Sequence, residues 1–159
     1  AIEDRLFWNT VDIDWKYSEN PDYVHQSIDK DQYIQKKKQE ILGNLRFVDG
    51  IYTSLEIYTT AGKHIGFINC YPFPRGCALS QSAAIGIIIP SQENRASGYG
   101  TEALSLYTEY LFGRNIEKIY LITQPSNIAM RRAACKCGFV PQHDLSGSAA
   151  VLHMVKKRT

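Results

Sequence analysis

The sequence has almost no excess of charge and no long apolar run. Eighteen Lys and Arg side chains stand against 16 Asp and Glu side chains, which gives a formal net charge of +2. This balance gives no reason to expect binding to a nucleic-acid duplex or to an acidic membrane surface. No stretch reaches the roughly 20 apolar residues that span a bilayer, and no basic-then-apolar leader is visible. We therefore expect a soluble, cytoplasmic protein that holds any anion by local groups.

Cysteine is also scarce, and its spacing does not predict a metal site. The four cysteines are Cys70, Cys77, Cys135 and Cys137. Their C-x6-C and C-x-C spacings, without a neighbouring pair of histidines, do not match those of structural zinc sites. We predict reduced thiols and no bound metal.

The 159 residues, 44% of them hydrophobic, predict one compact domain over 1–159. The chain begins at Ala1 rather than at Met, which leaves open whether residues precede it. Residues 1–28 predict loop and a short helix. Patterning predicts helices at 29–42, 100–112 and 127–137, and strands at 51–60, 64–73, 83–90, 116–123, 140–145 and 149–155. This order of elements is typical of a mixed α/β sheet flanked by helices.

A glycine-rich turn precedes the second predicted helix, in the stretch ENRASGYGTEAL (93–104). A helix that begins at such a turn presents free backbone N–H groups and the positive end of its dipole, so it suits an anion such as phosphate. The turn has neither the G-x-G-x-x-G spacing of dinucleotide sites nor the Gly-Lys-Ser/Thr of triphosphate loops. What remains is the pattern Arg95-x-x-Gly98-x-Gly100 after an apolar strand.

A second motif follows at a fixed distance: Asn127, with Gly138 and Phe139 eleven and twelve residues later. Together the two motifs resemble the GNAT acetyltransferase superfamily, and the arrangement looks most like its ribosomal-protein alanine acetyltransferase branch. The resemblance implies a mostly antiparallel sheet in which two central strands splay apart around acetyl-coenzyme A. It also implies transfer of an acetyl group to a primary amine of a small molecule or of a protein N-terminus.

The resemblance further implies a set of cofactor-binding residues. The backbone of three isoleucines would pair with the pantetheine arm, amides of the turn would hold the pyrophosphate, and helix residues would reach the arm and phosphates. These residues are Ile87, Ile88 and Ile89; Arg95, Ala96, Ser97, Gly98, Tyr99, Gly100 and Thr101; and Asn127 and Arg132, with Arg131 and Lys136 as further candidates. Each has a structural alternative: core packing for the isoleucines, an ion pair with Glu93 for Arg95, a helix cap for Asn127, and solvated charge for the basic residues.

The usual proton-transfer residues of the superfamily are missing. The position of its common Glu is Ala84, and that of its common Tyr is Ala134. The backbone N–H of Ile88 is a candidate to polarise the thioester carbonyl. Candidates for the acid or base are Cys135, Tyr120, His143, His153, Glu56 and Tyr99.

These departures leave alternatives open, because another residue or water could move the protons, or the domain could bind a coenzyme A ester without turnover. A domain with no coenzyme affinity is a further alternative. We expect the acceptor near residues 1–28 and the connector with Tyr71, Phe73 and Arg75. Trp8, Trp15 and Tyr23 would either line that pocket or pack in the core. Dimerisation is left open.

Overall fold

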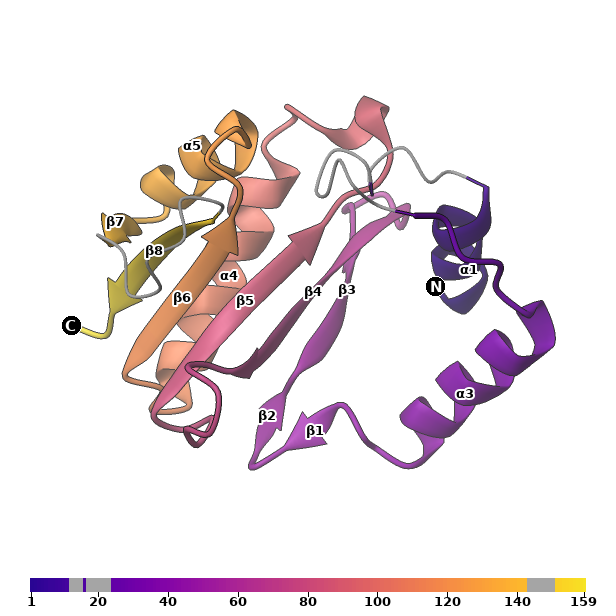
Figure 1. Cartoon of the computed structure of the whole chain (residues 1–159), viewed down its shortest axis with the longest axis horizontal. Helices are drawn as coiled ribbons and strands as arrows, with labels where there is room; N and C mark the ends of the chain where they lie inside the picture. The colour runs from indigo at the N-terminus through magenta and orange to yellow at the C-terminus, as the bar shows by residue number, and fades with distance from the viewer. Residues whose placement is uncertain (12–15, 17–23, 143–150) are drawn as a thin grey trace.

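The structure, a computed structural model, describes residues 1–11, 16, 24–142 and 151–159. A six-stranded sheet with the order β3-β4-β5-β6-β8-β7 is flanked by helices (Figure 1). The helices are α1 (Ile2–Thr10), α3 (Lys30–Leu42), α4 (Tyr99–Gly113) and α5 (Ile128–Lys136), with a 3-10 turn at Gln92–Asn94. The strands are β1 (Phe47–Val48), β2 (Ile51–Tyr52), β3 (Ser54–Tyr58), β4 (His64–Pro72), β5 (Ser82–Ile88), β6 (Lys118–Thr123), β7 (Val140–Gln142) and β8 (Leu152–Lys157).

The sheet is mostly antiparallel, and only β5 and β6 pair in parallel. A parallel pair needs a long crossover connection, which here contains α4. The connection between β6 and β8 contains α5 and the edge strand β7. The fold class expected from the sequence, a mixed and mostly antiparallel sheet with flanking helices, is thus confirmed.

Several predicted strands have other bounds than the observed ones: the strand predicted over 116–123 begins at Lys118, and the strand predicted over 149–155 is observed over Leu152–Lys157. Two further differences concern the central sheet. The strand predicted over 51–60 is interrupted, because Ile51 and Tyr52 pair with β1 in a separate hairpin. Asp49 and Gly50 connect the hairpin with φ of 51° and 79°, as a two-residue hairpin turn requires. The other strand, predicted over 83–90, ends at Ile88.

The predicted helices form, and their caps follow from the sequence. Asp29 caps α3 by accepting a hydrogen bond from the N–H of Gln32 at 2.8 Å, and Gly43 ends that helix. Asn127 caps α5 in the same way, accepting from the N–H of Met130 at 3.1 Å. A side-chain cap satisfies one of the free donors at a helix start.

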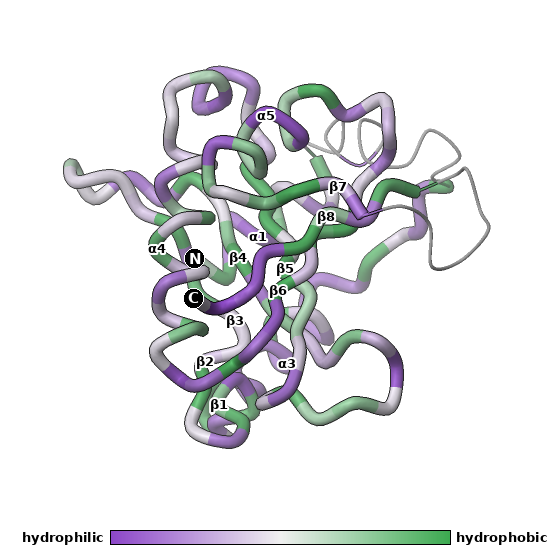
Figure 2. Tube along the Cα trace, turned by 90° about the vertical axis from the view of Figure 1, so that its left-hand side faces the viewer, coloured by the Kyte–Doolittle hydropathy of each residue, from purple (hydrophilic) through white to green (hydrophobic). Residues whose placement is uncertain are grey.

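The sheet has two distinct faces. On one face, α4 packs against the sheet through Leu104, Tyr107 and Leu111, which belong to the main core. In Figure 1, α4 lies behind the sheet, and in Figure 2 hydrophobic stretches run through the central strands. On the opposite face, α1 packs over β3 and β4, where Arg5 contacts both Glu56 and the ring of Phe67. We call this second face, which also carries Ala84 and Tyr120, the α1 face.

Candidate active site

The two central strands part at their carboxyl ends. Residues Ser82–Ile85 of β5 pair with Lys118–Leu121 of β6. Both strands continue, to Ile88 and Thr123, without pairing with each other. A cavity of about 290 Å³ lies between these ends. The splay that the resemblance implied is therefore present, at the predicted pair of strands.

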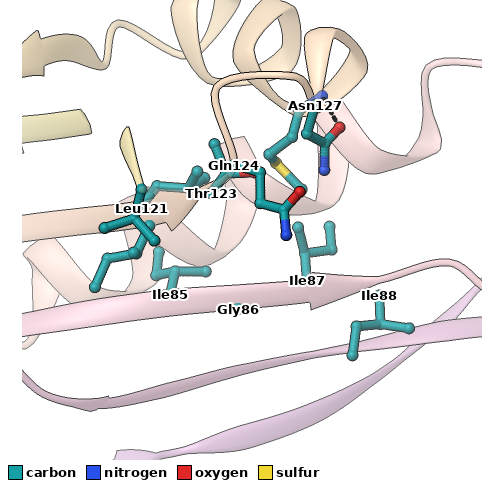
Figure 3. Close-up of a pocket in the computed structure, with 11 residues that line it drawn as sticks. Ile85, Gly86, Ile87, Ile88, Leu121, Thr123, Gln124 and Asn127 are labelled. Carbon is teal, nitrogen blue, oxygen red and sulfur yellow. Dashed lines mark hydrogen bonds between the residues drawn. The ribbon is translucent and has the colours of Figure 1, made fainter. Parts of the chain in front are cut away.

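The walls of this gap come from both strands and from the start of α5. Figure 3 shows Ile85 and Ile87 on one side of β5 and Ile88 on the other. Gln124 and Asn127 project from the segment after β6. Strand β4 pairs with β5 as far as Ile88, so backbone groups of β5 that face β6 lose their partners only at the gap.

A larger cavity continues from the gap toward the glycine turn. Its volume is about 700 Å³, and it shares Ile87, Ile88, Asn127 and Met130 with the first. Its other walls come from the turn before α4 and from α5. They include Ile89, Asn94, Arg95, Ala96, Gly98, Gly100, Thr101, Arg132 and Lys136. The two motifs singled out in the sequence thus border one continuous space.

Gly98 and Gly100 have different local roles at the start of α4. Gly98 has a left-handed backbone, with φ of 87°, and precedes the helix. A Cβ atom on Gly100 would meet only Ile89 Cδ1, at an ordinary 3.6 Å. In the described structure, the first amide of the helix with an acceptor is that of Glu102, which donates to Gly98 O at 3.0 Å. The preceding amides are therefore available to an anion.

The guanidinium of Arg95 holds the turn together. Its Nε donates to Ile89 O and its Nη2 to Pro90 O, both at 2.9 Å. The ion pair with Glu93 considered as an alternative is wrong, because Glu93 pairs with Lys63 at 2.5 Å. Arg95 also lines the larger cavity.

The basic residues of α5 separate into two groups. Arg132 and Lys136 line the larger cavity. Arg131 donates to Pro125 O at 2.9 Å and does not line the cavity. With Arg95, the cavity therefore has three cationic side chains and a helix N-terminus on its walls, a combination suited to phosphate groups.

Known proteins carry the same fold. The sequence profile of the acetyltransferase (GNAT) domain matches residues 5–140. The chain belongs to the GNAT acetyltransferase family. It is accordingly an acyltransferase. No curated protein sequence matches it.

Three solved GNAT structures illustrate the likeness. Spermidine N-acetyltransferase from Vibrio cholerae, in complex with CoA and spermine, superposes with a TM-score of 0.68 at 18% identity, covering 99% of this chain and 89% of that one. Ribosomal-protein-alanine N-acetyltransferase from Brucella melitensis gives 0.65 at 16%, covering 99% and 96%. Aminoglycoside acetyltransferase AAC(6')-Ib, in complex with coenzyme A and kanamycin, gives 0.59 at 19%, covering 79% and 77%. At these identities the likeness concerns the fold.

The two positions at which this GNAT chain lacks a carboxylate and a phenol are both fully buried. Ala84 packs on the α1 face with Tyr120 and Val155. Ala134 belongs to α5 and packs into the main core. Small side chains fill these sites completely, so any group that moves a proton must come from elsewhere.

The sequence candidates for that group are dispersed. Tyr120 is buried, with its ring 5.0 Å from that of Phe73. Cys135 is exposed on α5 and borders neither cavity. Tyr99 is the first residue of α4 and borders neither cavity. His143 lies outside the described residues.

Glu56 is committed to a structural network. It accepts from Arg5 Nε at 2.9 Å and from Arg46 Nη1 at 2.8 Å, and it lies 3.1 Å from His64 Nε2. Burial raises the pKa of its carboxyl, but the two guanidinium groups outweigh this effect and lower the pKa overall. A carboxylate held ionised in this way is a weak base.

Part of the expected acceptor region is also structural. Trp8 is buried and packs with its ring 4.8 Å from His64, so of the two roles considered it has the packing role. Trp15 and Tyr23 lie outside the described residues. Tyr71 is exposed at the end of β4.

Several lining residues were missed by sequence reasoning. Gln124, Ser126, Met130 and Val151 border the cavities. Proximity to Asn127 in the sequence could have pointed to the first three, but no sequence signal pointed to Val151.

The described part of the chain contains no cluster of His, Cys, Asp or Glu that could bind a metal ion. Within the same residues, no helix has the length and hydropathy needed to cross a membrane.

Proposed function

We propose that this protein transfers an acetyl group from acetyl-CoA to a primary amine of a small molecule or of a protein N-terminus. The observation that carries the proposal is the parting of β5 and β6 beyond Ile85 and Leu121, with a cavity that continues to the N-terminus of α4. A thioester arm can enter between the strands while a diphosphate rests at the helix. Family membership supports the same reaction class.

The backbone amides and cationic side chains that line the two cavities suit the amides and phosphates of coenzyme A. The backbone of Ile87–Ile89 would pair with the pantetheine amides as an added strand does. Amides of residues 96–101 would hold the diphosphate, and Arg132 and Lys136 would neutralise phosphate charge. When bound, acetyl-CoA supplies the activated acetyl thioester, and a backbone N–H on the β6 side of β5, such as that of Ile87, would polarise its carbonyl. The N–H of Ile88, the candidate from the sequence, is on the β4 side, because Phe73 N donates to Ser82 O and the backbone groups of β5 alternate in direction from there to Ile88. We take residues 1–159 as a single domain with this activity.

The cap made by Asn127 does not exclude a second role. Its Oδ1 accepts from the helix amide, while the residue borders both cavities. We propose that its side-chain amide N–H₂ contacts the coenzyme arm. Both roles considered from the sequence can thus hold together.

The acceptor is best sought among amines related to those of the structural relatives. Titration calorimetry with acetyl-CoA, followed by a thiol-release assay with spermine, kanamycin and an alanine-initiated peptide, tests the proposal. We expect saturable binding and thiol release that depends on at least one amine. A flat binding isotherm would contradict the proposal at its first step.

A second candidate is a module that binds coenzyme A esters without turnover. It is favoured by the burial of Ala84 and Ala134, which removes both usual proton-transfer side chains. Binding without thiol release, over the whole amine panel, would support this candidate against the first.

A further inference from the structure

Two polar side chains lie in the row of the sheet at which β5 and β6 part. The next residues after the last parallel pair are Gly86 and Ile122. Gly86 is opposite Asn69 on β4, and Ile122 is opposite His153 on β8. Asn69 and His153 therefore belong to this row, each one strand beyond the two strands that border the gap, and neither is among the residues that line the two cavities.

Both side chains project from the same face. Ile68 and Cys70 pack in the main core with α4, so the residue between them projects from the α1 face. Val155 packs on the α1 face with Ala84, and His153, two residues before it, shares that face. This is the face from which the carboxylate is missing at Ala84.

Asn69 lies directly over the strand that borders the gap. A Cβ atom placed on Gly86 would be 2.6 Å from Asn69 Oδ1, so the amide occupies the space that a side chain would fill. No hydrogen bond joins this amide to another described residue. Its oxygen is therefore able to accept an N–H from an amine.

His153 is buried and packs against the ring of Phe73. Its ring centroid is 5.6 Å from that of Phe73, and within the described chain no hydrogen bond involves its imidazole. Opposite it on β7, Gln142 has a buried Oε1 without a partner in the described structure. Side chains directly opposite in a sheet are close enough to interact, so this oxygen can accept an imidazole N–H.

The other titratable groups described on this part of the face are less suited to accept a proton. Tyr120 is two residues before Ile122, and a neutral phenol is a poor proton acceptor. Lys118 and Lys157, opposite each other and two residues further from the gap, carry ammonium groups that can only donate. A neutral imidazole has one ring nitrogen that can accept a proton, as a general base requires.

We propose that His153 is the general base of acetyl transfer and that Asn69 holds the acceptor amine. This inference rests on the proposed function. His153 takes one proton from the substrate ammonium through bridging water, because three strand spacings of about 4.8 Å separate its backbone from that of Asn69, and it releases the proton to solvent. The neutral amine forms the C–N bond as the C–S bond breaks, and the second proton leaves nitrogen and ends on the coenzyme A sulfur.

The test compares His153→Gln, Asn69→Ala and the control His25→Gln, which removes an exposed imidazole. Each is assayed against pH with acetyl-CoA and the best amine of the panel. We expect kcat of His153→Gln to fall about 100-fold or more, with acetyl-CoA affinity retained and the acidic limb of the kcat profile lost. Asn69→Ala should raise KM for the amine, and His25→Gln should match the wild type.

A second readout does not depend on turnover. In the wild type, the imidazole resonances of His153, assigned by their absence in His153→Gln, should shift when CoA and the amine are added together. Unchanged resonances, or a His153→Gln enzyme with wild-type kcat and acidic limb, would overturn the assignment of the base. A wild type that binds no acetyl-CoA or acetylates no amine would instead overturn the proposed function itself.

Discussion

Gly98 and Gly100 belong to one turn but are constrained by different forces. Gly98 needs its left-handed backbone, and any other residue there costs about 1–2 kcal/mol in strain. Gly100 has helical geometry and space for a small side chain toward the Ile89 side chain. A substitution at Gly100 can therefore fill the space next to a bound anion without straining the backbone of the turn, whereas a substitution at Gly98 cannot.

We therefore predict that Gly100→Val removes most acetyl-CoA affinity while the protein remains folded. The added methyl groups would lie on the wall of the larger cavity, where the diphosphate is expected. Calorimetry measures affinity and a thermal melt measures folding. Gly98→Val should lose both affinity and stability. Unchanged affinity in a folded Gly100→Val protein would contradict a diphosphate at this helix start.

Arg95 tests whether geometry or charge matters in the turn. Its two donors span neighbouring carbonyls of Ile89 and Pro90, and a lysine ammonium lacks that planar fork. We predict that Arg95→Ala weakens acetyl-CoA binding by about 1–3 kcal/mol. Arg95→Lys should weaken it similarly, because the turn loses its clamp. Wild-type acetyl-CoA affinity in Arg95→Lys would contradict this prediction, because it would show that Arg95 contributes only its positive charge.

At the scale of elements, α1 is attached to the sheet by a charged network. Arg5 donates to Glu56 and to Ser54, and His64 bridges Glu56 and Asp4. Because the pKa of Glu56 is lowered on folding, its stabilising effect is present above its unfolded pKa, near 4.5, and is lost as pH falls below it.

We predict that Glu56→Gln lowers the free energy of unfolding at pH 7 by about 1–3 kcal/mol, since two guanidinium groups lose their carboxylate. The variant should also lose less stability than the wild type between pH 4.5 and pH 3. Urea unfolding at several pH values measures both effects. Glu93→Gln, which breaks an exposed ion pair with Lys63, is the control and should leave stability nearly unchanged. Equal acid sensitivity of Glu56→Gln and the wild type would contradict this account.

Local elements were largely predictable because their signals are local. Asp29 and Asn127 are cap residues, and each correctly predicts the start of a helix. The continuous apolar run of β5 predicts a strand buried on both faces, and Ala83–Ile85 are buried. A glycine inside an apolar strand, such as Gly86, predicts a bulge or a close backbone approach. It marks the approach of Asn69, and the irregularity lies instead at Ile57 and Tyr58 of β3. The Asp49-Gly50 hairpin was missed although it carries a recognised turn signal.

At the scale of the whole molecule, the sequence pattern did not determine strand order. Strand β8 inserts between β6 and β7, a pairing that depends on contacts distant in the chain. The site was likewise only partly predictable. The two sequence motifs predicted that the glycine turn and the start of α5 border one cavity, but only the pairing of the strands places Asn69 and His153 in one row of the sheet. The sequence also predicts a turn at 146–148, between the last two predicted strands, and this turn lies outside the described residues.

The central claim is that one coenzyme spans both cavities, from the gap between β5 and β6 to the start of α4. Amide hydrogen exchange with and without coenzyme A tests it most directly, because the two ends are read in one measurement. We predict added protection of amides in 87–89 and in 96–101 together. Binding that protects neither segment, or only a segment elsewhere in the sheet, would contradict the account.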